Sequence, residues 1–190
     1  MDNKKLIAGF GYQEGRISSW DGKRTYTQAV PQMAKHCCDN GVDEILVYDW
    51  SVTDEDHEAA IAVIKEVCRE ADAPVIAGGR VKRMEDVKKY LYAGASAVFL
   101  DMSKEENTDM IKEASDRFGK EKIYAYLPTD EYIDSVKDYE AAGASVMLLN
   151  TAGSVPSLLE MASISDSEAS FLFFLQAKDD AKDTAESLKN

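Results

Sequence analysis

Apolar and polar residues follow one another along the chain in a repeating order of strand and helix. Short apolar runs, fit for buried parallel strands, alternate with segments whose apolar residues recur every three or four positions, as in amphipathic helices. Strands are predicted at residues 6–10, 44–49, 74–77, 95–101, 122–127 and 144–150. Helices are predicted at 26–40 and in segments that begin near residues 53, 84, 103 and 129. This order predicts a parallel sheet with right-handed crossovers, either doubly wound or a barrel.

Three segments share one plan, in which a helix-ending glycine leads into a buried strand that ends on Asp or Asn. They run over residues 41–49, 94–101 and 143–150. Each interval between their glycines holds two strand–helix units. We therefore predict an α/β fold with a TIM-barrel-like (βα) repeat, incomplete at six to seven units, because a full barrel needs about 250 residues.

One barrel domain is expected over residues 1–176, with a polar helical tail or linker at 177–190. The pattern weakens after Asn150. Residues 154–161 are compatible with a short helix, and residues 171–176 with either a strand or a helix segment, because periodicity cannot separate the two at this length. Trp20, Trp50 and the aromatic run at 171–174 are expected to cover an exposed flank that needs a partner.

Net charge narrows the possible partners. The chain of 190 residues carries a formal charge of −13, which argues against nucleic acid but leaves room for a small anion in a local basic pocket. No apolar run is long enough to span a membrane, and no signal-peptide core follows the first five residues, so we expect a cytoplasmic protein.

Cysteine and histidine give little sign of metal or cofactor chemistry. Cys37, Cys38 and Cys68 lack the spacing of a metal or redox site and are interpreted as small buried hydrophobes. His36 has no visible acid or nucleophile partner, and His57 is expected to be solvent-exposed in the first turn of a helix. We expect no metal and no cofactor.

The segment 74–93 offers the clearest candidate for ligand binding. Gly78 and Gly79 allow a tight turn or the close approach of a ligand between a strand and a helix. Bare N–H groups at the helix start would suit a phosphate, and Arg80 and Lys82 add positive charge. The alternative is a tight turn that binds nothing, with Arg80 filling the place of the phosphate.

Two carboxylates end predicted strands and are candidates for catalysis. Asp49 and Asp101 could act together as acid and base if they share one cleft. The alternative is structural: Asp49 caps a loop, and Asp101 pairs with Arg80 or Lys82. We favour the structural interpretation.

Four motifs stand out together: Glu14-Gly15-Arg16 and the segments 41–49, 77–86 and 93–98. Through these motifs, residues 4–150 resemble the cyclase subunit of imidazole glycerol phosphate synthase and its sister isomerase in histidine biosynthesis. The resemblance implies a barrel that holds one phosphate of a two-phosphate substrate after its third and fourth strands. Carried over by position, that site comprises Gly78, Gly79 and Arg80, with Asp101, Met102 and Ser103 opposite.

The sequence departs from that family at the positions that matter most for catalysis. The family's essential acids end its first and fifth strands, where this chain has Gly11 and Leu127. Arg80 replaces an expected third glycine, and Asp101 replaces an expected Asn. The strands that hold the second phosphate in the family have no recognisable counterpart here.

The resemblance extends to the divergent cyclase-like N-terminal domain of some bifunctional phosphoribosyl-AMP cyclohydrolase/phosphoribosyl-ATP pyrophosphatase proteins. It implies a hydrolase as the parent protein, with the catalytic metal cluster outside these residues. The expected partners are a phosphorylated ribose-type small molecule and either a second copy of the chain or downstream catalytic domains.

Three functions stay open at this point. The first is a degenerate cyclase-like domain with one possible phosphate site and a structural, regulatory or oligomerising role. The second is an active lyase or sugar-phosphate isomerase that uses Asp49 and Asp101. The third is an interaction module in which Arg80 and Asp101 neutralise one another.

Overall fold

Parallel strands form the centre of the molecule. A computed structural model describes residues 7–18, 22–23, 25, 27, 29–128, 135–150 and 170–176, with 149–150 and 170–176 described for the backbone only. Within these residues the parallel strands lie in the order β1 (Ile7–Gln13), β3 (Glu44–Asp49), β4 (Val75–Gly78), β5 (Ala97–Asp101), β6 (Ile123–Leu127), β7 (Val146–Asn150) and β8 (Ser170–Gln176). A short strand, β2 (Arg16–Ser18), pairs antiparallel with β1.

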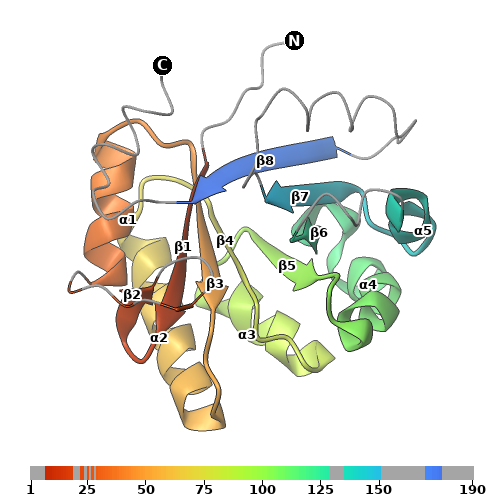
Figure 1. The fold of residues 1–190 in the computed structure, drawn as a ribbon, viewed down its shortest axis with the longest axis horizontal. Coiled ribbons are helices and arrows are strands. Elements are labelled where there is room, and N and C mark those ends of the chain that lie inside the picture. Colours follow the sequence, from red (N-terminus) through yellow and green to blue (C-terminus); the bar gives the residue numbers. More distant parts are fainter. Residues whose placement is uncertain are drawn as a thin grey trace.

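The last strand links the two ends of this sheet. β8 pairs with β7 along its length, and its final residues Leu175 and Gln176 also pair in parallel with Ala8 and Gly9 of β1. Figure 1 shows β8 crossing from β7 to β1. The predicted TIM-barrel-like repeat of parallel strands is confirmed, with seven such strands among the described residues instead of eight.

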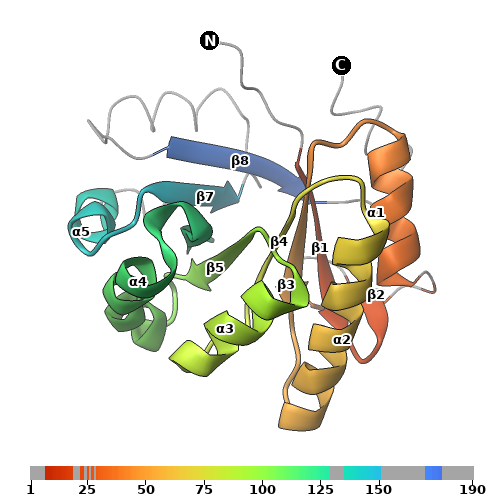
Figure 2. The same cartoon turned by 180° about the vertical axis from the view of Figure 1, so that it is seen from behind.

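Helices cover the outside of the sheet (Figures 1 and 2). They are α1 (Val30–Asp39), α2 (Asp54–Glu70), α3 (Met84–Ala93), α4 (Glu105–Phe118) and α5 (Val136–Ala141), with a 3-10 turn, η1, at Lys120–Lys122. Local chemistry sets their ends. The Thr53 side chain accepts the Asp56 N–H at the start of α2, and Gly94 takes a left-handed conformation, φ 110°, after α3. No helix of the described residues is both long and apolar enough to cross a membrane.

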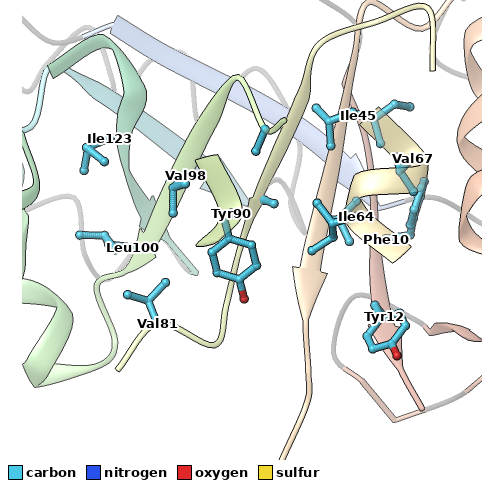
Figure 3. Packing of buried hydrophobic residues seen from close by; sticks show 14 of the residues in the cluster. Phe10, Tyr12, Ile45, Ile64, Val67, Val81, Tyr90, Val98, Leu100 and Ile123 are labelled. Atoms are coloured by element: carbon cyan, nitrogen blue, oxygen red, sulfur yellow. The ribbon is translucent and has the colours of Figure 1, made fainter. Parts of the chain in front are cut away.

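The larger core lies between the sheet and the helices. Figure 3 shows Ile64 and Val67 of α2 facing Ile45 of β3, and Tyr90 of α3 beside Val98 of β5. Each fully buried aliphatic side chain in this layer stabilises the fold by roughly 1.5–3 kcal/mol. Since side chains alternate along a strand, this layer takes Ile45 and Val47 of β3, and the intervening residues face the barrel interior.

The second core fills the barrel interior and is unusually aromatic. Its buried members come from the strands and include Tyr48, Phe99 and Tyr126. The strand register places Gly11, Tyr48, Gly78 and Phe99 next to one another across β1, β3, β4 and β5. Glycine and aromatic residues therefore alternate across this row, so the space beside each glycine is available to a neighbouring ring.

The first strand is longer than its apolar run predicts. It continues to Gln13, so Gly11 lies inside the strand and not at its end. Glu14 and Gly15 then form a two-residue hairpin turn with φ values of 48° and 77°, of the kind that matches strand twist. The segment at 171–176 is part of a strand. The predictions for Trp20, residues 154–161 and the tail at 177–190 fall outside the described residues.

Candidate functional site

A pocket of about 390 Å³ opens at the carboxyl ends of β3 and β4, the end of the sheet where barrels bind ligands. Three cationic side chains, Arg80, Lys82 and Lys104, contribute to its lining. The remaining lining residues are Tyr48, Asp49, Trp50, Ser51, Val52, Gly79, Val81 and Glu106. The predicted phosphate residues Gly79, Arg80 and Lys82 are thus brought together, but Gly78 and Ser103 do not line this pocket.

Neighbouring side chains explain the glycine pair in this loop. A Cβ on Gly78 would lie 2.3 Å from the Phe99 carbonyl oxygen. Gly79 has φ 106°, and a Cβ there would lie 2.5 Å from the Tyr48 ring. Both glycines are therefore required by packing, whether or not a ligand approaches the loop.

Two backbone N–H groups directly before α3 are already bonded. The Asp86 carboxylate accepts from the backbone N–H of Lys82 at 3.0 Å and of Arg83 at 3.2 Å. A backbone hydrogen bond from Arg80 also reaches the Tyr90 oxygen. The prediction that bare N–H groups of this turn would face a ligand is therefore wrong for Lys82 and Arg83.

Arg80 is the central cation of the pocket. Its side chain is buried at 7% exposure, and its Nη2 donates to Asp54 at 2.7 Å and to the Val52 carbonyl oxygen at 3.4 Å. Its Nε is buried and has no hydrogen-bond partner. The hydrogen bond and charge of Arg80 lower the pKa of the Asp54 carboxyl group. The expected ion pair between Arg80 and Asp101 is therefore wrong, because Arg80 pairs with Asp54.

Lys104 is a pocket residue that the sequence analysis missed. Its Nζ donates to the Gly79 carbonyl oxygen at 2.5 Å and lies 5.7 Å from the centre of the Tyr48 ring. Lys104 is also the N-cap residue of α4, where the helix dipole disfavours a cation. A lysine at such a position, close behind a strand end, was the signal that could have identified it.

Asp49 has its hydrogen-bonding capacity taken up by buried neighbours. Its Oδ1 accepts the Ser51 N–H at 2.9 Å, and its Oδ2 accepts from the Tyr90 hydroxyl at 2.7 Å and from His57 Nδ1 at 2.8 Å. Burial, and after it the Asp49 charge, raises the pKa of Tyr90, which therefore stays a proton donor in this bond. Asp49 caps its loop, as the structural interpretation predicted.

His57 belongs to this buried network. Its exposed fraction is 1%, so the prediction of a solvent-exposed histidine is wrong. Its Nδ1 faces Asp49, and its Nε2 lies 3.7 Å from Asp86 without a hydrogen-bond partner. The burial of His57 has no sign in the sequence because Asp49, Tyr90 and Asp86 come from different elements, and only the fold brings them around the first turn of α2.

Asp101 forms a second closed group. Its Oδ2 accepts the Tyr48 hydroxyl at 2.7 Å, and its Oδ1 accepts the Ser103 N–H at 3.0 Å and the Ser103 hydroxyl at 2.6 Å. Burial, followed by the Asp101 charge, raises the pKa of Tyr48. Ser103 is therefore a partner of Asp101, and the same contacts leave no carboxylate oxygen of Asp101 without a donor.

The two carboxylates lie on opposite faces of the sheet. Asp49 alternates with Tyr48 and shares the helix side with Ile45 and Val47, where His57 and Tyr90 meet it. Asp101 bonds to Tyr48, which faces the barrel interior. The hypothesis of an acid–base pair formed by Asp49 and Asp101 in one cleft is therefore wrong, because the sheet separates them.

Aromatic rings occupy the interior near this end of the barrel. The Tyr48 and Trp50 rings stack with centroids 4.1 Å apart, and Tyr48, Phe99 and Tyr126 contact one another at centroid distances of 5.5–6.1 Å. The Leu127 side chain is fully buried in the helix-side core. The barrel interior at the level of Tyr48, Phe99 and Tyr126 is thus filled by packed rings, and Leu127 lies on the other face of the sheet.

Burial keeps the cysteines in the thiol form. It raises the pKa of Cys37 to about 12 and that of Cys68 to about 11. We therefore expect Cys37 to be the slowest of the three to react with a disulfide reagent, its rate still rising tenfold per pH unit at pH 10. A rate that levels off near pH 9 would contradict this, and the urea-unfolded chain gives the reference rate.

No group of His, Cys, Asp and Glu among the described residues is arranged to hold a metal.

Comparison with known proteins agrees with this architecture. The family model described as histidine biosynthesis protein matches residues 14–140. The HisF subunits of imidazole glycerol phosphate synthase from Staphylococcus aureus strains Newman and COL are each 30% identical to this chain over 137 residues. The matched region covers 70% of this chain and 53% of each relative, so the chain spans about half the length of these relatives. The chain belongs to the histidine biosynthesis protein family and is HisF-like.

Proposed function

We propose that this chain is a catalytically inactive HisF-like barrel domain that binds one phosphorylated small molecule beside Arg80. It serves as a structural, regulatory or oligomerising module of a larger histidine-biosynthesis protein. The candidate for that larger protein is a phosphoribosyl-AMP cyclohydrolase/phosphoribosyl-ATP pyrophosphatase, whose catalytic parts would lie outside these residues.

The proposal that the domain is inactive rests on the hydrogen bonds that Asp49 and Asp101 already accept. A general base needs a carboxylate that can reach the substrate proton, and each oxygen of Asp49 and Asp101 already accepts a hydrogen bond from a neighbour. The positions where the family has its essential acids hold Gly11 and Leu127, neither of which can transfer a proton.

The charge of the pocket supports the proposal of phosphate binding. The protein as a whole is acidic, at −13, yet one pocket is lined by three cations, Arg80, Lys82 and Lys104, against two acids, Asp49 and Glu106. Buried Arg80 Nε and Ser51 Oγ both lack hydrogen-bond partners, although each residue lines the pocket. Guanidinium and hydroxyl groups on residues that line one pocket are suited to the oxygens of a phosphate group.

Phosphate binding tests the ligand half of the proposal. We expect saturable binding of ribose 5-phosphate by isothermal titration calorimetry, weakened at least tenfold by Arg80→Ala, since a charge-assisted hydrogen bond contributes about 1.5–3 kcal/mol. The control is Arg117→Ala, which changes net charge equally at an exposed site on α4. Arg80→Lys retains the charge and should bind with intermediate affinity. Equal affinity of all three variants would contradict the site.

An activity assay tests the catalytic half. We expect no imidazole glycerol phosphate from the substrate of the HisF relatives when the purified chain is supplied with ammonia. Turnover that Asp101→Asn abolishes would show that Asp101 is catalytic and would overturn the proposal. The folded state of Asp101→Asn has to be confirmed by circular dichroism, because Asp101 also bonds Tyr48 and Ser103.

A further inference from the structure

We propose that the Asp54 carboxylate is a built-in competitor of the anion at Arg80. The Asp54 carboxylate accepts a hydrogen bond from the Arg80 guanidinium group, and a bound phosphate would displace it from there. This inference rests on the proposed phosphate site and adds a residue that sets its affinity.

The two side chains of the ion pair differ sharply in solvent exposure. The Arg80 side chain is 7% exposed, whereas the Asp54 side chain is 90% exposed, and the distance from Nη2 to Oδ1 is 2.7 Å. Arg80 is held by the protein around it, including the Val52 carbonyl oxygen. Asp54 can rotate into water at small cost, because an ion pair with so exposed a partner contributes little to stability.

The donors of Arg80 are only partly used by Asp54. The ion pair engages Nη2, while the buried Nε has no hydrogen-bond partner. A phosphate has three terminal oxygens and can engage two donors of one guanidinium group at once, which adds both energy and geometry. Lys82 and Lys104 line the same pocket and favour the more highly charged anion over the carboxylate.

The start of α2 stabilises the Asp54 charge whether its side chain is paired with Arg80 or turned into water. Asp54 is the first residue of α2, directly after the Thr53 N-cap, where a negative charge is stabilised by the helix dipole. The neighbouring acids behave differently: Glu55 lines another pocket, together with Gln13 and Glu14, and Asp56 accepts a hydrogen bond from the Tyr12 hydroxyl at 3.4 Å. Asp54 is thus the acid of this turn that bonds Arg80.

Titration of inorganic phosphate into Asp54→Asn tests the inference. We expect phosphate to bind roughly fivefold more tightly than to the unaltered chain, because removal of one charge beside the bound anion is worth about 1 kcal/mol near a protein surface. Glu55→Gln is the matched control, with the same change of net charge one residue away, and should stay within about twofold of the unaltered chain. Measurement at low ionic strength keeps the charge effect visible.

The outcomes separate this inference from the proposed function. Equal phosphate affinity of Asp54→Asn, Glu55→Gln and the unaltered chain would overturn the role of Asp54 and leave the phosphate site standing. Equal tightening by both substitutions would show an effect of net charge and would also overturn it. Failure of every variant, Asp54→Asn included, to bind phosphate would overturn the site itself. Tighter binding by Asp54→Asn alone supports both.

Discussion

Replacement of Asp49 by alanine is expected to lower the free energy of unfolding by about 4 kcal/mol. The substitution leaves the Ser51 N–H, the Tyr90 hydroxyl and His57 Nδ1 without their acceptor. All three residues are buried, with exposed fractions of 7% or less. A buried donor without a partner costs about 1–3 kcal/mol, and the three losses overlap because they share one site.

Urea unfolding followed by circular dichroism measures this effect. The control is Asp109→Ala, which removes a carboxylate at an exposed position of α4 and should change the free energy of unfolding by no more than about 0.5 kcal/mol. Asp49→Asn keeps one acceptor oxygen and should fall between the two. A loss below about 1 kcal/mol for Asp49→Ala would mean that the Asp49 network does not hold β3, α2 and α3 together.

The role of Asp49 shows how far sequence reasoning reached. The strand at 44–49, its terminal acid and the structural interpretation of that acid all followed from the apolar run and the loop behind it. The sequence did not reveal on which face of the sheet the Asp49 side chain lies. All six residues of β3 are buried, so alternation has no polar side to mark the helix face or the barrel interior.

Long-range contacts explain the other failures. The ion pair of Arg80 with Asp54 joins residues 26 positions apart, and the bond of Tyr90 to Asp49 spans 41. Charge and spacing along the chain identified Arg80 as a pocket cation, since it follows a strand and a glycine pair. They gave no sign that Asp54 is its partner, because Asp54 follows a different strand and only the fold brings the two strand ends together.

The sequence predicts the turn at Gly78 and Gly79 at the right place but supplies only part of the reason for its two glycines. Sequence reasoning offered ligand approach or a tight turn for Gly78 and Gly79. The structure adds a third requirement, the Tyr48 and Phe99 rings of the barrel interior. Both rings lie beside these glycines, so packing alone is a sufficient reason for glycine at both positions of the turn.

Gly79→Ala is accordingly expected to destabilise the chain by about 3 kcal/mol or more. A left-handed φ of 106° strains any residue with a Cβ, and that Cβ would also meet the Tyr48 ring at 2.5 Å and the Asp49 carbonyl oxygen at 2.9 Å. Backbone strain costs about 1–3 kcal/mol, and overpacking a further 1–3 kcal/mol. Thermal and urea unfolding of the variant measure the sum.

Substitutions at Gly15 and Gly78 distinguish backbone strain from steric conflict as causes of the loss at Gly79. Gly15 has φ 77°, and a Cβ at this position would meet nothing within 4 Å, so Gly15→Ala carries backbone strain alone and should cost about 1 kcal/mol. Gly78→Ala carries the steric conflict with Phe99 and should approach the Gly79 value. A Gly79→Ala chain as stable as Gly15→Ala, but without phosphate affinity, would show that ligand approach and not Tyr48 explains this glycine.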